Sequence, residues 1–350
     1  MTMTMFASRR GVLAGLAVSL CATLAPVSGA LAQDAVADFY RGKTVTIYVG
    51  FGPGGGYDLY GRLASDYLGQ YIPGNPDVIV ENMPGAGGRL AAQYLYAVAP
   101  KDGTALSVVV QSVAMDSATG AIPGNIDAAR FNAIGRMTAN YELGITWHTT
   151  GIETFDDTLT TPVAFASTGA GSASAFVPLM LNDLEGTQYK IIQGYEGVAS
   201  ARLALESGEV DAMMAGLAGL QSSNPEWIND GIVNVIWQLS TAPHPDFPDV
   251  PAIGQLGETE DEQAMFRLVA GAADIGRALI TTPDVPQDRV DALRAAFDAM
   301  AADPAFIEAA AQRNLDLDIL SGAALQEVIH SQMDVSDEAI DLTRSYVLAQ

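Results

Sequence analysis

The chain contains a single cysteine, Cys21, close to its N-terminus. One cysteine cannot form a disulfide within the chain, and it leaves no thiolate cluster for a metal centre. Histidine is nearly as scarce, because His148, His244 and His330 are the only three and stand far apart. This spacing fits none of the usual histidine metal motifs. We therefore expect no metal site, and no Gly-x-Ser-x-Gly nucleophile motif is present either.

Positive charge is also scarce. Lys and Arg together number 17 against 41 Asp and Glu, which gives a formal net charge of −24. A negative field of this size repels nucleic acids and anionic membrane surfaces, so neither is expected as a partner. The same field repels small anions at long range, so a site for an anion would need strong local compensation.

Long apolar runs are missing except at the N-terminus. Arg9 and Arg10 precede an uncharged segment at 11–25, and Ala30-Leu31-Ala32 has the form of a cleavage signal. This pattern is typical of a secretory signal peptide at 1–32, cleaved near Ala32. The segment 8–13 also resembles a twin-arginine signal, so the export route stays open. No later stretch approaches the roughly 18 apolar residues of a membrane span, so we expect a soluble periplasmic protein.

Strand-like and helix-like patterns alternate along the rest of the chain. A first series has strands at 44–49, 78–80 and 106–110, with helices at about 57–71 and 90–98. A second series begins near Leu143, with strands at 162–166, 189–192, 210–214 and 232–239 and helices at 173–184 and 197–206. Two further helical patterns follow, one containing Val290, Leu293, Phe297 and Met300 and one after Leu325. The alternation predicts an α/β fold with mostly parallel sheets.

The order strand, glycine loop, helix occurs twice, at 49–58 and at 166–174. Ligands of open α/β sheets bind at the carboxyl ends of the strands. Two such ends that face each other across a hinge would enclose one ligand. We therefore expect two lobes, with 33–140 and 241–350 in lobe I and 141–240 in lobe II.

The first glycine loop, 50–58, has two interpretations. Backbone N–H groups at a helix start bind anions, which suits either a phosphate or a carboxylate. Gly50, Gly52 and Gly55 match the spacing of the dinucleotide fingerprint. However, Pro53 lacks an N–H, and an exported chain has no ready supply of nicotinamide cofactor. An exported dinucleotide-dependent oxidoreductase is thus the weaker alternative, and the missing Gly-Lys-Ser/Thr excludes a phosphate P-loop. We expect no cofactor and no enzymatic activity.

Several short motifs together resemble the Bug receptors, the extracytoplasmic solute-binding proteins of tripartite tricarboxylate transporters. Their order and spacing agree from about Tyr40 to Gly254. The motifs are Gly52-Pro53-Gly54-Gly55-Gly56-Tyr57-Asp58, Val80-Glu81-Asn82-Met83-Pro84-Gly85-Ala86-Gly87-Gly88, Pro100-Lys101-Asp102-Gly103-Thr104, Thr168-Gly169-Ala170-Gly171-Ser172, Gly194-Tyr195-Glu196-Gly197, Gly208-Glu209-Val210-Asp211 and Pro248-Asp249-Val250-Pro251-Ala252-Ile253.

The resemblance implies a two-lobed Venus-flytrap fold with one ligand cleft between the lobes. It implies a periplasmic receptor, monomeric, that captures a small organic acid and delivers it to the permease subunits of a transporter. A ligand-binding sensor for a signalling partner is the alternative within the same class. The ligand-binding residues that it implies are Gly52, Gly54, Gly55, Gly56, Tyr57, Asp58, Gln111, Ser112, Thr168, Gly169, Ser172, Tyr195, Gly197 and Asp211.

The implied roles differ along this set. The first-loop glycines would approach the ligand by their backbone, and Asp58 would order that loop by capping. Where the family often has a basic residue or a lysine, this chain has Met83 and Glu196. These departures weigh against a multiply charged, citrate-like ligand, whereas a monocarboxylate, an aromatic acid or a neutral compound fits equally well. The attraction for an anion is then expected to come mainly from local backbone dipoles.

Overall fold

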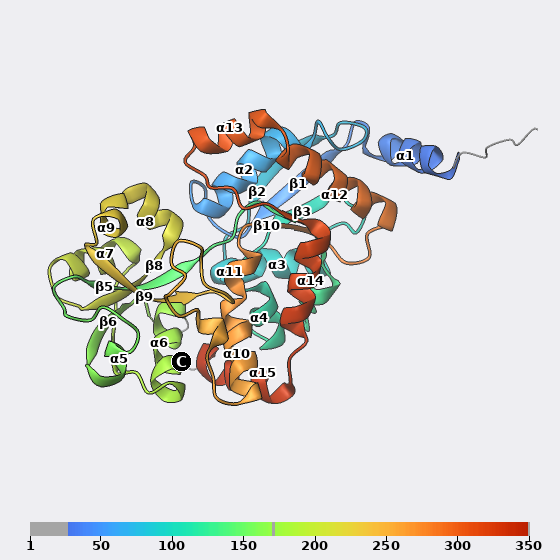
Figure 1. Cartoon of the computed structure of the whole chain (residues 1–350). Helices are drawn as coiled ribbons and strands as arrows, with labels where there is room; N and C mark the ends of the chain where they lie inside the picture. The colour runs from blue at the N-terminus through green and yellow to red at the C-terminus, as the bar shows by residue number, and fades with distance from the viewer. Residues whose placement is uncertain (1–26, 170–171, 349–350) are drawn as a thin grey trace, which may run out of the picture.

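The computed structural model describes residues 27–169 and 172–348. The basic and apolar parts of the predicted signal peptide lie outside the described residues. The first helix, α1 (Val27–Tyr40), runs through the predicted cleavage position at Ala32 and projects from one end of the molecule (Figure 1). No described helix has the length and apolar character needed to cross a membrane.

The described strands form two sheets, one in each of two bodies that lie next to each other in Figure 1. The first sheet has the order β11-β4-β10-β3-β1-β2, with β1 Thr44–Val49, β2 Asp77–Asn82, β3 Ala105–Val108, β4 Asn132–Arg136, β10 Ala278–Thr281 and β11 Leu320–Ser321. The second has the order β7-β6-β8-β5-β9, with β5 Glu142–Trp147, β6 Val163–Ser167, β7 Tyr189–Gln193, β8 Ala212–Gly216 and β9 Val233–Leu239. The predicted α/β fold is confirmed.

Helices cover both sheets. Around the first sheet are α2 Gly56–Leu68, α3 Arg89–Ala97, α4 Val113–Ala118, α12 Gln287–Ala301, α13 Pro304–Gln312 and α14 Gly322–Met333, with 3₁₀ turns η1 Ala86–Gly88 and η2 Ala128–Arg130. Around the second are α5 Asp157–Thr160, α6 Ala173–Leu184, α7 Val198–Glu206, α8 Leu217–Ser223 and α9 Pro225–Asn229. The chain then forms η3 Ile253–Gln255, α10 Glu260–Ala270 and α11 Ala272–Ile275, and ends with α15 Asp337–Val347.

The prediction of mostly parallel sheets is wrong, because both sheets are mixed. β1 pairs in parallel with β2 and β3, and β6 with β7 and β8. β10 and β5 instead lie antiparallel to their neighbours. Parallel neighbours need a crossover connection within one sheet. β5 follows β4, which belongs to the other sheet, and the chain reaches β10 from the second body. Neither β5 nor β10 is therefore joined by a crossover to a neighbour in its own sheet, and both can lie antiparallel.

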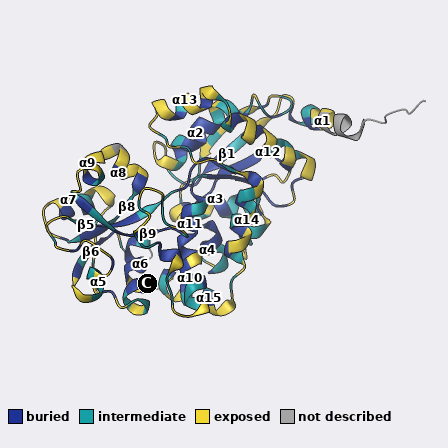
Figure 2. Cartoon of the chain, in the orientation of Figure 1, coloured by how far each residue is buried: buried dark blue, intermediate teal, exposed yellow. Residues whose placement is uncertain are grey.

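Burial follows this topology (Figure 2). The central strands β3 and β10 are buried along their whole length. The edge strand β2 alternates between exposed and half-buried positions instead. A central strand covered on both faces has mostly apolar residues, whereas an edge strand needs only one apolar face. The two buried hydroxyls of these central strands, Ser107 and Thr281, donate to the carbonyls of Tyr48 and Ala105. The fully buried strands thus lie in the middle of the first sheet.

The two glycine turns of the first body pack against each other. A Cβ added at Gly50 would lie 2.6 Å from the Cα of Gly88, so the backbones touch there. Gly88 itself has φ +91, a left-handed conformation that glycine adopts without strain. These glycines thus bring the end of β1 against the start of α3, at the carboxyl edge of the first sheet.

The chain passes between the two sheets after β4 and again after β9. One apolar core, however, joins α10 and α15 to the second sheet, since Phe266, Val269 and Val347 pack in the same cluster as Phe165 and Phe176. We therefore propose the predicted division, 33–140 plus 241–350 and 141–240, with α10 and α15 as helices that also support lobe II.

Candidate functional site

A cavity of about 280 Å³ lies between the two sheets. Ligand pockets usually measure roughly 300–1,000 Å³, so this one suits a small molecule. Its lining comes from both bodies: Tyr57, Arg89, Gln111, Ser112, Met115, Asn140, Glu142, Ala173, Phe176, Met214, Leu239, Val269, Ala272 and Arg277. Strand ends and helix starts thus converge on it, as expected for open α/β sheets.

Arg277 is the central cation of this cavity. Its guanidinium lies 4.0 Å from the centre of the Tyr57 ring. Nη1 donates to Oε1 of Gln111 at 2.9 Å, and Nη2 donates to Oδ1 of Asn140 at 3.1 Å. Both acceptors are neutral amides, and no described carboxylate forms a salt bridge with Arg277. An arginine positioned in this way retains its charge for an anionic ligand.

Backbone geometry fixes the position of Arg277. Its N–H donates to the carbonyl of Thr138 at 2.9 Å, immediately before β10. The preceding Gly276 has φ +51, and a Cβ there would overlap that same carbonyl oxygen. Only glycine fits such a close approach in this conformation. Gly276 therefore sets the direction in which Arg277 enters the cavity.

Arg89 is the second cation, at the start of α3. Its Nη2 donates to Oδ1 of the buried Asp116 at 2.7 Å. Asp116 also accepts from the hydroxyl of Ser112 at 2.6 Å. The Nε of Arg89 is buried and has no hydrogen-bond partner among the described residues. Asp116 thus neutralises the charge of Arg89, while the Nε–H of Arg89 has no acceptor among the described residues.

Glu142 is the one acidic side chain of the lining. It begins β5 and accepts from Nδ2 of Asn140 at 3.1 Å through Oε1. No described residue donates to its Oε2. Burial raises the pKa of the Glu142 carboxyl, against the Asn140 hydrogen bond and the nearby Arg277, which lower it. A half-buried carboxyl with one oxygen unpartnered among the described residues can accept a hydrogen bond from a ligand.

The remaining lining is apolar and comes mainly from α6, β8, β9 and α10. Its members are Met115, Ala173, Phe176, Met214, Leu239, Val269 and Ala272. Met115, Phe176, Leu239 and Val269 belong to one apolar cluster, and Ala173 and Met214 pack against it. Hydrogen bonds link Tyr57, Gln111 and Arg277 into a polar group. The lining therefore has a polar end and an apolar end, as small-molecule sites commonly do.

Three of the predicted site residues, Tyr57, Gln111 and Ser112, line the cavity. The backbone N–H of Gln111 donates to the Tyr57 hydroxyl at 3.1 Å. Burial raises the pKa of Tyr57, and Arg277 beside the ring counteracts this effect. The phenol therefore stays neutral and orients Gln111 toward the cation.

The first glycine loop lies beside the cavity rather than in its lining. Gly52, Gly54, Gly55 and Gly56 are exposed, whereas Asp58 is buried. Asp58 accepts from the N–H of Gly54, from Arg62 and from Asn82, each at 2.8 Å. A carboxylate with three such donors fixes the loop firmly. The backbone contacts predicted for the loop glycines stay a prediction.

The described residues of the second glycine loop form hydrogen bonds with one another and with Ser174, which follows the loop. Thr168 and Ser172 both contact the hydroxyl of Ser174, at 3.3 and 2.9 Å between oxygens. The Ser172 hydroxyl also donates to the carbonyl of Gly169 at 2.6 Å. The motif residues 170 and 171 lie outside the described residues. None of these described loop residues lines the cavity, although Ala173 directly after them does.

Three predicted residues of lobe II have local partners instead. The Tyr195 hydroxyl donates to Glu209 at 2.8 Å, and Gly197 precedes α7 as its N-cap. Asp211 accepts from the N–H of Ala164 at 2.8 Å and thereby ties β8 to β6. These contacts give the three residues roles in the second sheet, and their predicted contact with a ligand stays a prediction.

Sequence reasoning missed Arg89, Asn140, Glu142 and Arg277. It looked for cations at the positions of Met83 and Glu196, and it assigned the attraction for anions to backbone dipoles. The structure adds two guanidinium groups that line the cavity, and the share of the backbone dipoles stays a prediction. Arg89 directly follows the second glycine turn, so a basic residue at a helix start was a usable signal there. Arg277 had no comparable signal.

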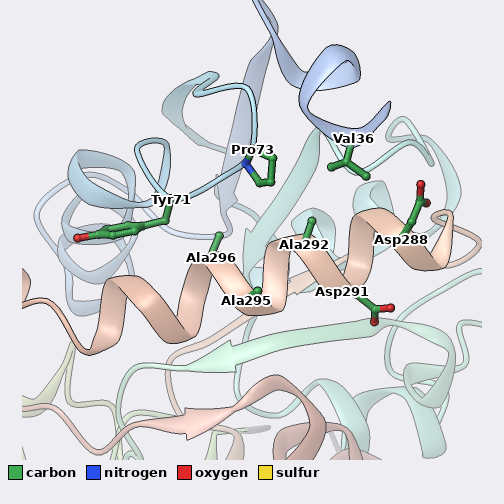
Figure 3. A pocket seen from close by; sticks show the side chains of 8 residues that line it. All are labelled: Val36, Tyr71, Pro73, Asp288, Asp291, Ala292, Ala295 and Ala296. Carbon is green, nitrogen blue, oxygen red and sulfur yellow. The ribbon is translucent and has the colours of Figure 1, made fainter. Parts of the chain in front are cut away.

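Two other hollows are less suited to an anion. One of about 380 Å³ lies between α1 and α12 and is lined by Val36, Tyr71, Pro73, Asp288, Asp291, Ala292, Ala295 and Ala296 (Figure 3). Another, of about 420 Å³, contains Asp316 and Asp318. Neither lining includes a lysine or an arginine, so acidic groups would repel a carboxylate in both.

Comparison with known proteins identifies the family. Residues 64–342 match the model of the tripartite tricarboxylate transporter family receptor, TctC. The chain belongs to this receptor family. It is also similar to the UPF0065 protein in the gbd 5′ region of Cupriavidus necator. The two chains are 26% identical over 302 residues, a stretch that covers 84% of each. The resemblance to the Bug receptors is thereby confirmed, and the family consists of periplasmic receptors rather than enzymes.

Solved structures agree on the fold. A TctC solute-binding protein from Polaromonas, without ligand, gives a TM-score of 0.66 at 18% identity over 89% of this chain and 100% of that one. MatC from Rhodopseudomonas palustris, with bound malate, gives a TM-score of 0.56 at 22% identity over 85% of this chain and 99% of that one. At these identities the likeness concerns the fold alone. It confirms the two-lobed solute-binding architecture for this receptor.

Proposed function

We propose that this receptor binds a small carboxylate in the cavity between its two sheets. The observation that carries the proposal is Arg277, a cation whose hydrogen-bond acceptors are neutral and which lines the small cavity between the two sheets. The similar MatC structure contains malate, which is itself a small carboxylate. Tyr57, Gln111 and Ser112 hold the polar end of the site around this cation.

The receptor then delivers its ligand to the membrane permease of a tripartite tricarboxylate transporter. Ligand that contacts both lobes favours the closed form by its differential affinity, and the permease recognises that form. The mature protein is a periplasmic monomer released by cleavage near Ala32, with no catalytic activity of its own. The first-loop glycines, Thr168, Gly169 and Ser172 come closer to the ligand in this closed form.

Thermal unfolding of the mature protein with a panel of mono-, di- and tricarboxylates tests the proposal. At a concentration of about 100 Kd, a ligand of the native state stabilises it by about 2.7 kcal/mol, which raises Tm by several degrees. Arg277→Gln should weaken binding about 10- to 100-fold, as loss of a hydrogen bond to a charged group does. The matched control is Arg313→Gln, an exposed arginine paired with Asp66, which should bind as the wild type.

Two results would contradict this function. One is a panel in which no carboxylic acid raises Tm while a nucleotide or a neutral compound does. The other is full carboxylate affinity in a folded Arg277→Gln variant, which would place the site elsewhere.

A further inference from the structure

Asn140 connects the two opposite charges of the cavity. Its carbonyl oxygen accepts from Arg277 at 3.1 Å, and its amide nitrogen donates to Glu142 at 3.1 Å. A single carboxamide therefore spans the gap between the guanidinium and the carboxyl. A ligand that lies beside Asn140 and reaches both charged groups must likewise offer one acceptor and one donor a few ångströms apart. An α-amino acid has this pattern, with a carboxylate oxygen and an ammonium nitrogen on neighbouring atoms.

We propose that the ligand of this site is an α-amino acid with an apolar side chain. Its carboxylate is bound by Arg277 and its ammonium group by the free Oε2 of Glu142. The inference rests on the proposed function, because it specifies which small carboxylate occupies the same cavity.

The charge balance of the lining supports a zwitterion. Asp116 already neutralises Arg89, which leaves Arg277 and Glu142 as the two groups to be matched. A ligand without an amine would leave the Glu142 carboxyl facing a second carboxylate. An ammonium group supplies the donor that Oε2 lacks.

The apolar end of the cavity favours an apolar ligand side chain. Phe176, Met214, Leu239 and Val269 belong to that end and carry no hydrogen-bonding side chain. A polar or charged ligand side chain would lose its hydration there without compensation. At about 280 Å³, the cavity also limits the ligand to the size of a single amino acid.

Calorimetry with matched ligands tests this inference on the wild-type mature protein. The probes are L-valine, L-leucine and L-phenylalanine, each compared with the acid that lacks its amino group and with the amine that lacks its carboxylate. At least one amino acid should bind about tenfold or more tightly than its des-amino acid, and the amine should not bind. Aspartate and glutamate should bind more weakly than the best apolar amino acid.

Glu142→Gln assigns the effect to one residue. The variant should lose about tenfold or more in affinity for the amino acid and keep its affinity for the des-amino acid within a few-fold. Glu308→Gln, an exposed glutamate of α13, is the matched control and should change neither. Circular dichroism checks that both variants fold, and the comparison of ligands on the wild type does not depend on them.

The outcomes separate the two proposals. If the des-amino acids or dicarboxylates bind as tightly as the amino acids, or if Glu142→Gln keeps the preference, the amino-acid inference is overturned while a carboxylate receptor stands. If no carboxylate binds, with or without an amine, the proposed function itself fails.

Discussion

Asp58 stabilises the first glycine loop through its charge. Burial opposes ionisation, yet hydrogen bonds from Arg62, the Gly54 N–H and Asn82 outweigh it and lower the pKa of Asp58 to about 2. A lowered native pKa stabilises the fold wherever the carboxyl is ionised in the native state. This contribution is complete above the usual value of 3.8 and is lost as the pH falls toward about 2.

Replacement of this carboxylate should therefore have a pH-dependent cost. We expect Asp58→Asn to lower the free energy of unfolding by about 1–3 kcal/mol near neutral pH, and by less as the pH approaches about 2. Urea unfolding at both pH values measures the difference. The exposed Asp298→Asn on α12 should stay within about 0.5 kcal/mol of the wild type. A cost for Asp58→Asn that does not change with pH would show that its charge is not what stabilises the loop.

Arg277 and Glu142 show which residues a sequence does not reveal. They lie 135 positions apart by their numbers and meet only because β10 and β5 begin near each other across two sheets. Neither stands in a motif, and one arginine among many acidic residues gives no local signal. Asp58 was accessible to prediction instead, since its partner Gly54 lies only four residues away.

Elements that rest on local periodicity were predicted closely. Thr44–Val49 and Ala173–Leu184 have the predicted bounds. The direction of β5 and β10 was not predictable in this way, because it depends on how the chain crosses between the two sheets. The same crossing decides which strand ends face each other, and hence the composition of the cavity.

The turn between α11 and β10 is the element that positions Arg277. We expect Gly276→Ala to be about 1–3 kcal/mol less stable than Gly231→Ala and to weaken ligand binding as well. Both glycines have positive φ, but a Cβ at Gly231 would meet no atom within 4 Å. Chemical unfolding and calorimetry of both variants separate backbone strain from overlap with Thr138. Equal stability and equal affinity in the two variants would contradict this role.

The whole molecule carries a net charge of −24 and yet is expected to attract an anion. The long-range field opposes this, but it is screened beyond about 8–10 Å at ordinary ionic strength. Inside the cavity, the nearest charges decide instead, and Arg277 forms no salt bridge with a carboxylate of the part of the chain that the structure describes. In the proposed closed form, the two lobes would exclude water around Arg277 and strengthen that interaction.

The most direct measurement is a crystal structure of the mature protein grown with the ligand that stabilises it most. We predict that the ligand carboxylate contacts the guanidinium of Arg277 between the two sheets, and that residues of both lobes touch the ligand. Ligand density confined to the hollow between α1 and α12, or bound with its carboxylate remote from Arg277, would contradict the account.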